Sequence, residues 1–347
     1  MITVENLTTS IPGPTTALRD VSFEIGAGAL YGLLGHPGAG ASELARLLSL
    51  HERPDEGAIR VDDVDTTRLD TQSLRDLRER FSLVEAYPSL RGERTVAGNV
   101  ATPLERRGVD GPNRRERVLS LLDLVGLARA GVRHPGELDE GQRRRVALAR
   151  ALVTDPAVLV VDEPTAGLDA DRAGAVLAAL DRARAELGVT IVVATTDAGV
   201  VRKVCDSVAV LADGKVLETG TVFDLITDQH SHLARHVLPR TDGTAITDGF
   251  DAVADVTLIG HATVGTTIPA AADRIGVEIT TLDGGTTRIG DVPVARYRIG
   301  LHGEKAGIAL GWIGEHGGLV TPVRRPARVT AIGSRAIREP ALAGVAA

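Results

Sequence analysis

The chain has 347 residues, of which 43% are hydrophobic and 24% charged, with a formal net charge of -7 and a pI near 5.8. This length suffices for a sizeable core and favours two domains over one, while the negative balance argues against a nucleic-acid partner. No apolar run approaches the ~18 residues of a membrane-spanning helix, and the N-terminus does not resemble a secretion signal. We expect a cytoplasmic chain that reaches membranes only through partners.

The first part of the chain alternates short β-branched runs with helical stretches, as in a parallel sheet covered by helices. Apolar residues recur three and four positions apart in the helical stretches. The predicted strands are 28–35, 81–86, 157–164, 190–196 and 207–215, and the predicted helices are 42–50, 114–127, 140–153 and 170–188.

Between about residues 221 and 251 the pattern loosens into polar residues, Gly and Pro, which is typical of a helix followed by an interdomain connection and places a domain boundary near residue 250. Strand, helix, strand, strand, helix and strand then follow at 254–261, 267–276, 277–285, 294–303, 305–317 and 319–324. This order is that of the split βαβ, ferredoxin-like fold. We therefore expect domains at 1–240 and 253–327, a linker at 241–252, and a flexible tail at 328–347.

The segment "GHPGAGAS" lies between an apolar strand and a helix, the setting of a phosphate-binding loop of the form G-x-x-x-x-G-K-[ST]. Glycine would let backbone N–H groups converge on phosphate oxygens, and the terminal Ser would ligate magnesium. Alanine stands where such a loop has its lysine, so a glycine-rich turn without a ligand is an equal alternative for this segment alone. Its residues are Gly35, His36, Pro37, Gly38, Ala39, Gly40, Ala41 and Ser42.

A second motif lies about 120 residues downstream, where the apolar strand "AVLVVDEP" ends in Asp162 and Glu163. Two adjacent carboxylates at the end of a buried strand are costly unless a cation or polar ligand meets them. We expect Asp162 to hold magnesium and Glu163 to polarise an attacking water.

Together with "LDEGQRRRVALARAL" and "DEPTAGLD", these motifs make residues 1 to about 240 resemble the ATP-binding subunit of an ABC transporter. The stretches "LRDVSFEIGAGALYGLLG", "LLSLHERPDEGAIRVDD" and "RTVAGNVATPLE" resemble the ATPase subunit of methionine importers. The resemblance implies a RecA-like α/β domain with a helical subdomain and a C-terminal ferredoxin-like, ACT-like domain that binds an amino acid. It also implies ATP and Mg²⁺ as cofactors, and a dimer beneath two membrane permease subunits.

Carried over residue by residue, the resemblance assigns the metal and water roles to Asp162 and Glu163, and the aspartate of the following turn to Asp169. The signature, Leu-Ser-Gly-Gly-Gln in the family, falls on Leu138, Asp139, Glu140, Gly141 and Gln142. Two acids there would repel a triphosphate unless protonated or turned outward.

Three further positions depart from the family pattern. The glutamine of its switch loop falls on Glu85, the histidine that contacts the γ-phosphate on Thr196, and the aromatic residue that stacks on adenine on Ile11. One lost donor at a transition state lowers a rate by about 100- to 1000-fold, so we expect impaired hydrolysis and weakened ATP binding.

We therefore predict a nucleotide-binding subunit of an amino-acid importer at the cytoplasmic face of the membrane, as a homodimer or paired with a second ABC subunit. The alternative is a catalytically inactive pseudo-ATPase that serves as a binding or regulatory module. A further possibility is that the departures are scattered drift, with ATP still held by the loop backbone and magnesium. The C-terminal domain either forms an amino-acid effector site or serves only for dimerisation.

Other conspicuous residues favour structural roles. Cys205 lies in an apolar stretch and Trp312 on an apolar helix face, so both are expected in the core. The run "QRRRVALAR" is typical of a solvated helix face, and "DQHSHLARH" lacks the acids or cysteines that would favour a metal site.

Overall fold

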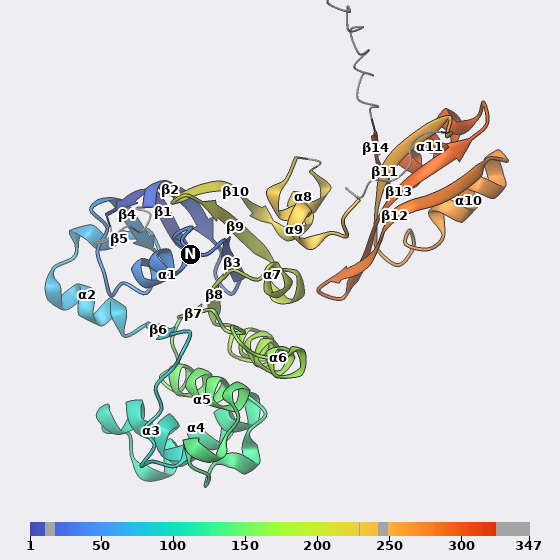
Figure 1. The fold of residues 1–347 in the computed structure, drawn as a ribbon. Helices are drawn as coiled ribbons and strands as arrows, with labels where there is room; N and C mark the ends of the chain where they lie inside the picture. The colour runs from blue at the N-terminus through green and yellow to red at the C-terminus, as the bar shows by residue number, and fades with distance from the viewer. Residues whose placement is uncertain (11–17, 229, 242–248, 324–347) are drawn as a thin grey trace, which may run out of the picture.

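The computed structural model describes residues 1–10, 18–228, 230–241 and 249–323, which form two α/β parts (Figure 1). Ile11 and the tail predicted at 328–347 lie outside the described residues, as does most of the predicted linker.

A six-stranded, mainly parallel sheet forms the centre of the first part. Its order is β10-β9-β3-β8-β7-β6, and only β9 and β10 pair antiparallel. Every residue of β3 and β8 is buried, because strands in the middle of a parallel sheet are covered on both faces. The strands are β3 (Leu30–Gly35), β6 (Phe81–Val84), β7 (Val158–Asp162), β8 (Thr190–Thr195), β9 (Ser207–Ala212) and β10 (Lys215–Thr221).

A second, antiparallel sheet of order β2-β1-β4-β5 packs beside the first and was missing from the sequence prediction. In β2 the buried and exposed positions nearly alternate, which is the signal of a half-buried strand that could have revealed it. Its core residues share a cluster with residues of β7, β8 and β9. The strands are β1 (Ile2–Thr9), β2 (Leu18–Ile25), β4 (Glu56–Val61) and β5 (Val64–Asp65).

Helices cover the sheets, and α3, α4 and α5 gather into a helical subdomain (Figure 1). Thr95, Asp110 and Asp139 begin these three helices, each accepting a backbone N–H bond as N-cap. Of the nine helices among the described residues of this part, α2, α3 and α7 were not predicted, and the single helix expected after residue 221 is two short helices, α8 and α9. The helices are α1 (Ala41–Leu48), α2 (Thr71–Arg78), α3 (Val96–Arg106), α4 (Gly111–Leu124), α5 (Glu140–Leu152), α6 (Ala170–Leu187), α7 (Ala198–Val204), α8 (Val222–Thr227) and α9 (His232–Val237), with single 3₁₀ turns at Thr66–Arg68, Ala128–Ala130 and Pro135–Glu137.

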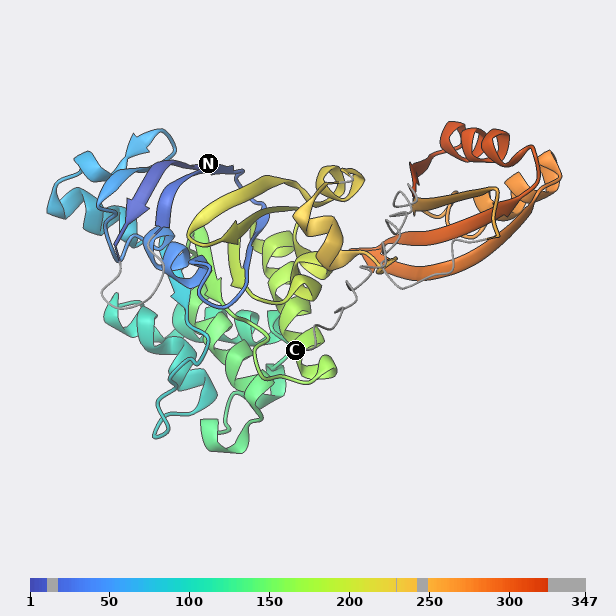
Figure 2. The same cartoon turned by 45° about the horizontal axis from the view of Figure 1, so that its top comes forward.

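The second part has the predicted ferredoxin-like order of elements and the strand order β12-β13-β11-β14. Both helices cover the same face of this sheet (Figure 2). Trp312 packs against its core and stacks on His316 at 3.8 Å between ring centroids, in agreement with a packing role. The elements are β11 (Ala252–Ile259), α10 (Thr267–Ile275), β12 (Glu278–Ile289), β13 (Val292–His302), α11 (Ala306–Glu315) and β14 (Gly318–Pro322).

The β12–β13 hairpin is longer than predicted and extends towards α7 (Figure 1). The N–H of Gly290 donates to the carbonyl of Arg202 at 2.8 Å, and the Arg202 guanidinium donates to Thr287. Ile289 and Val294 are 2% and 0% exposed and belong to the core cluster of the first part. The C-terminal sheet therefore contributes its hairpin to the core of the first part.

Because Ile289 lies in this shared core, Ile289→Ala is expected to lower the free energy of unfolding by about 2–5 kcal/mol. Ile308→Ala, at a position 60% exposed on α11, should change it by less than about 0.5 kcal/mol. Urea unfolding followed by fluorescence of Trp312, the chain's one tryptophan, measures both. Equal effects of the two substitutions would show that the hairpin is not anchored as described.

Candidate functional site

The predicted site residues meet at one edge of the parallel sheet. Leu34 of β3 pairs with Thr195 of β8, and Asp162 of β7 pairs with Ala194. The carboxyl ends of the three strands are therefore aligned, which is where ligands bind in sheets of this kind. The loop after β3, the two acids after β7 and Thr196 after β8 all leave the sheet at this edge.

The loop depends on its glycines. Gly40 begins α1 with φ of 102°, and a Cβ there would lie 2.6 Å from Cδ2 of Leu18. A Cβ on Gly35 would lie 2.7 Å from that of Ala39. Ala41 is 9% exposed and belongs to the core cluster. Its side chain is a methyl group, so this position supplies no cation to a phosphate.

Ser42 and Asp162 are in direct polar contact. The Ser42 hydroxyl donates to Oδ1 of Asp162 at 2.8 Å, although 120 residues separate them in sequence. Both line a cavity of 240 Å³ together with Glu85, which follows β6 and is exposed. Burial raises the pKa of Asp162, the bond from Ser42 opposes that rise, and nearby Arg46 also lowers it.

These two oxygen ligands suit magnesium, which usually takes one or two protein ligands and completes its shell with water and phosphate oxygens. No group of three or more His, Cys, Asp or Glu side chains suited to a metal ion occurs among the residues that the structure describes. The described part of the histidine segment at 228–236 therefore gives no support to a metal site there.

The carboxylate of Glu163 is held by the end of β8. Its Oε1 accepts the backbone N–H of Thr196 at 2.8 Å, and its Oε2 accepts the hydroxyl of Thr195 at 3.3 Å. The backbone N–H of Glu163 donates to Ala194 at 2.8 Å, and its φ is 44°. Thr196 thus contacts Glu163 through its backbone rather than through its side chain.

The two acids of the signature segment have local partners. Oδ1 of Asp139 accepts the N–H of Gln142 at 2.8 Å, and the side chain of Gln142 accepts the N–H of Asp139, which completes a capping box at the start of α5. Glu140 lies 3.5 Å from Arg143 and 3.7 Å from Arg144. Both charges are therefore used in a helix cap and in ion pairs, which reduces the repulsion that the sequence predicted.

The signature segment lies against the start of α6. Asp169 caps α6 by accepting the N–H of Arg172 at 2.9 Å, and the guanidinium of Arg172 lies 3.9 Å from Asp139. A Cβ on Gly141 would lie 3.0 Å from that of Arg172, so glycine permits this approach. None of the segment's five residues lines the cavity that holds Ser42 and Asp162.

The basic run of α5 was predicted to be a solvated face, and that prediction was wrong for most of its arginines, although the side chain of Arg143 is 41% exposed. Arg144 is 3% exposed, and burial lowers the pKa of Arg145 and of Arg150. Tertiary contacts with backbone carbonyls replace water around these guanidinium groups. Cys205 is buried as predicted, and burial raises the pKa of its thiol.

Comparison with known proteins identifies the family. Residues 18–166 match the model of the ABC transporter family. The methionine import ATP-binding protein MetN 2 of Yersinia pestis bv. Antiqua is 36% identical over 313 residues, which cover 89% of this chain and 95% of that protein. MetN 1 of Rhodococcus jostii is 40% identical over 308 residues, covering 86% and 89%.

The chain belongs to the ATP-binding subunits of the ABC transporter family. Solved structures agree: the dimeric cassette MJ0796 bound to ADP and Pi is 29% identical with a TM-score of 0.56, covering 64% of this chain and 98% of that one. The cbiO1 subunit of Clostridium perfringens is 31% identical with a TM-score of 0.59, covering 63% and 88%. The predicted RecA-like fold is thus confirmed.

ATP-binding subunits of this family bind ATP, normally with Mg²⁺. The match to the methionine-import relatives is too long to fit within the first 250 residues, so it extends into the ferredoxin-like part. Among the described residues, none of the helices combines the length and apolar character needed to cross a membrane.

The raised pKa of Asp162 has a consequence for stability. Its pKa is higher in the folded chain than in the unfolded one, so the folded state binds more protons between the two values. The free energy of unfolding therefore falls as pH rises through this interval, and above it the cost of the buried charge is fully present.

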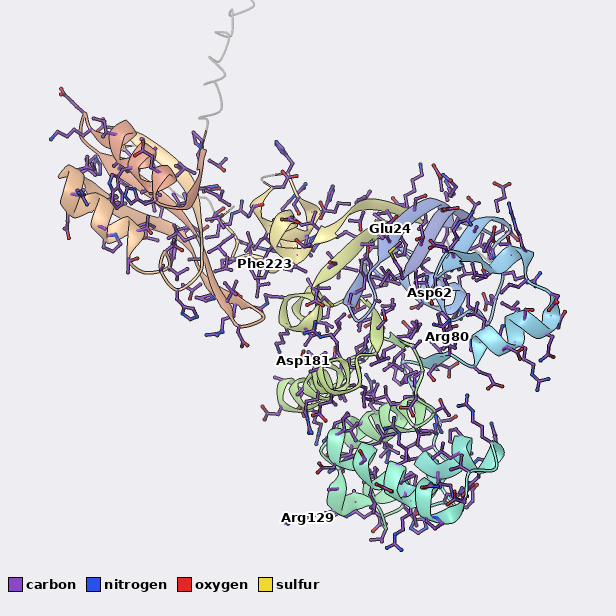
Figure 3. All side chains as sticks on the ribbon, turned by 180° about the vertical axis from the view of Figure 1, so that it is seen from behind. Glu24, Asp62, Arg80, Arg129, Asp181 and Phe223 are labelled. Carbon is purple, nitrogen blue, oxygen red and sulfur yellow. The ribbon has the colours of Figure 1, made fainter. Side chains whose placement is uncertain are left out.

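Asp162→Asn is accordingly expected to raise the midpoint of thermal unfolding at pH 7 without magnesium, a gain that shrinks as pH falls through the interval. Asp181→Asn on α6, at a side chain 55% exposed, is the control and should change nothing (Figure 3). Thermal scans over a pH series measure both. A lower midpoint for Asp162→Asn at pH 7 would contradict this account of the buried carboxylate.

Proposed function

We propose that this chain is the nucleotide-binding subunit of an amino-acid importer, acting at the cytoplasmic face of the membrane as a dimer beneath permease subunits. The main support is its likeness, over 89% of its length, to a methionine import ATP-binding protein. Methionine itself, as the transported solute, is supported only by the names of such relatives.

At the site, the backbone of residues 35–42 cradles the phosphates, Ser42 and Asp162 hold Mg²⁺, and Glu163 polarises the attacking water. The contact of 2.8 Å between Ser42 and Asp162 carries this assignment. Glu85, Thr196 and the signature segment take the remaining family positions. Hydrolysis is slow and ATP binding weakened, because Ala41 offers no ammonium to the β- and γ-phosphates and the side chain of Thr196 cannot replace a histidine.

The second candidate is a pseudo-ATPase, a module that binds or regulates without turnover. The observation that favours it is the pairing of the Glu163 carboxylate with the backbone N–H of Thr196. A carboxylate already engaged in this way is a poorer partner for a water molecule.

Restoring the family residues tests both candidates. Ala41→Lys combined with Asp139→Ser, Glu140→Gly and Thr196→His is expected to raise the rate of phosphate release by at least about 100-fold. Calorimetry with Mg-ATP and a phosphate-release assay measure binding and turnover, with Ser42→Ala as the variant that loses magnesium-dependent binding. Binding without turnover in the wild type favours the pseudo-ATPase, whereas wild-type turnover that the restored variant does not exceed would refute the role given to the departures.

We propose that the permease docks in a cavity of 490 Å³ between β6, α3 and α5. Arg91, Arg106 and Arg150 line it, and Arg150 carries a pKa lowered by burial and then by the other two arginines. Among the described residues, the guanidinium groups of Arg91 and Arg106 make no hydrogen bond or ion pair. The one acidic side chain in its lining is Glu85.

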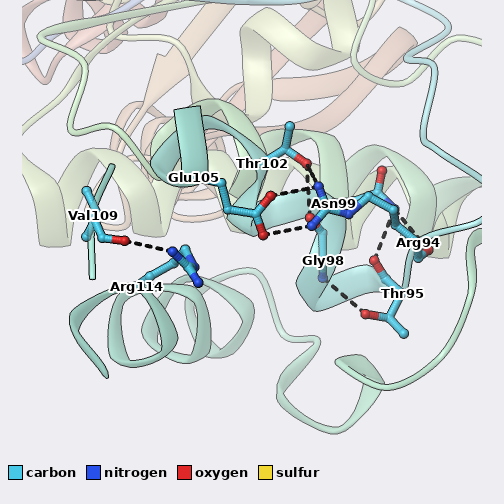
Figure 4. A network of polar contacts seen from close by, with 8 residues as sticks. All are labelled: Arg94, Thr95, Gly98, Asn99, Thr102, Glu105, Val109 and Arg114. Carbon is cyan, nitrogen blue, oxygen red and sulfur yellow. Dashed lines mark hydrogen bonds and ion pairs between the residues drawn. The ribbon is translucent and has the colours of Figure 1, made fainter. Parts of the chain in front are cut away.

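The neighbouring acid, Glu105, is already engaged. Arg94 binds it through two bonds of 2.7 and 2.8 Å (Figure 4). Buried Asn99 bonds to the carbonyls of Arg91, Arg94 and Thr95 and fixes this loop. The backbone at Arg91 is thus fixed, while the carboxylate of Glu105 is paired with Arg94 rather than with an arginine of the cavity. Charge complementarity therefore favours a permease segment that carries acidic side chains.

Charge reversal tests this docking site. Arg91→Glu combined with Arg106→Glu is expected to weaken the complex with the co-purifying permease at least about tenfold, because like charges would then face each other. Arg129→Glu, at another exposed position of the helical subdomain, is the matched control (Figure 3). The affinity of each variant for the permease is measured in detergent. Equal affinities of the two variants would show that the permease does not dock in this cavity.

For the ferredoxin-like part we propose an amino-acid effector role. The β12–β13 hairpin is bonded to Arg202 of α7, and α7 begins two residues after Thr196. A ligand that shifts the C-terminal sheet would therefore act on a helix joined directly to the end of β8. This contact supports regulation over a purely dimerising role.

A further inference from the structure

Arg144 joins three elements of the site. Its Nη1 donates to the carbonyl of Glu163 at 3.0 Å, and its Nη2 donates to the carbonyl of Ala166 at 2.6 Å. Its Nε lies 3.7 Å from Oε1 of Glu140 and makes no hydrogen bond. The guanidinium also lies 5.7 Å from the ring of Tyr87, which lines the cavity of Ser42 and Asp162.

The backbone at Glu163 requires such support. Its φ of 44° is in the left-handed region that residues other than glycine seldom adopt. Conformations of this kind persist only where the surroundings fix them. Here β8 fixes the N–H of Glu163 through Ala194, and α5 fixes its carbonyl through Arg144.

We propose that Arg144 is a positioning residue, which fixes the main chain from Glu163 to Ala166 against α5. The Glu163 carboxylate and the signature helix then move as one unit. The ion pair with Glu140 adds the first turn of α5 to this unit, which gives the unusual signature acid a structural use. The catalytic part of this inference rests on the proposed function, whereas the mechanical part does not.

The helix offers a matched control. Arg145 is also partly buried and bonds through Nη1 to two carbonyls, those of Val125 at 2.9 Å and Gly126 at 3.3 Å, but these belong to the helical subdomain. Arg144→Gln and Arg145→Gln therefore remove similar bonds from the same helix, and both should lower the midpoint of thermal unfolding. Only Arg144→Gln removes bonds to the main chain of residues 163–166.

Hydrogen exchange of the purified full chain separates the two variants. In Arg144→Gln, amide exchange in residues 163–168 is expected to be at least about tenfold faster than in the wild type, because two bonds from a charged donor are lost. In Arg145→Gln the faster exchange should appear near residues 125–127 instead. Arg144→Lys keeps the charge but loses the planar guanidinium that reaches two carbonyls at once, so its exchange rate in residues 163–168 should be intermediate.

A kinetic measurement extends the test. If the wild type hydrolyses ATP, Arg144→Gln should lower kcat at least about tenfold while the Kd for Mg-ATP changes less than about threefold, because positioning acts on the reacting step. A wild type without turnover would refute hydrolysis yet leave the exchange result decisive. Equal exchange at 163–168 in Arg144→Gln and Arg145→Gln would overturn the positioning role.

Discussion

The alignment of three parallel strand ends is the constraint on which the rest of the site depends. The pairing of β3, β8 and β7 brings Ser42 within 2.8 Å of Asp162 and places Glu163 beside Thr196. Strands buried on both faces cannot shift their register without moving apolar side chains out of the core. The apolar residues of the sheet therefore fix the polar residues at its edge.

The acidic side chains of the signature segment and of the turn before α6 have partners in their own local structure. Asp139 serves as a helix cap, Glu140 pairs with two arginines, and Asp169 caps α6. A carboxylate with backbone N–H partners or a nearby guanidinium is satisfied without a ligand. Counting acids along the sequence overstates the negative charge that a nucleotide would meet. Asp162 differs, because burial is the largest influence on its pKa.

The two parts of the molecule are physically connected through the β12–β13 hairpin. Ile289 and Val294 are buried in the core of the first part, while Gly290 and Thr287 bond to Arg202. In the first part, Arg144 makes a comparable link between α5 and the acidic strand. Each link joins residues that are separated in sequence. Each also connects another part of the fold to the edge of the parallel sheet where β3, β7 and β8 end.

Sequence alone was enough to predict the parallel sheet, the ferredoxin-like order and the loop and acidic motifs, because apolar periodicity and glycine placement are local signals. It missed the antiparallel sheet, although alternation in β2 was visible, and it assigned the arginines of α5 to solvent. The folded chain was needed to show that Arg144 is buried against Glu163, that Asp139 and Glu140 have partners, and that the hairpin reaches α7. Burial and pairing depend on which distant segments meet, and periodicity within one segment does not indicate what will pack against it.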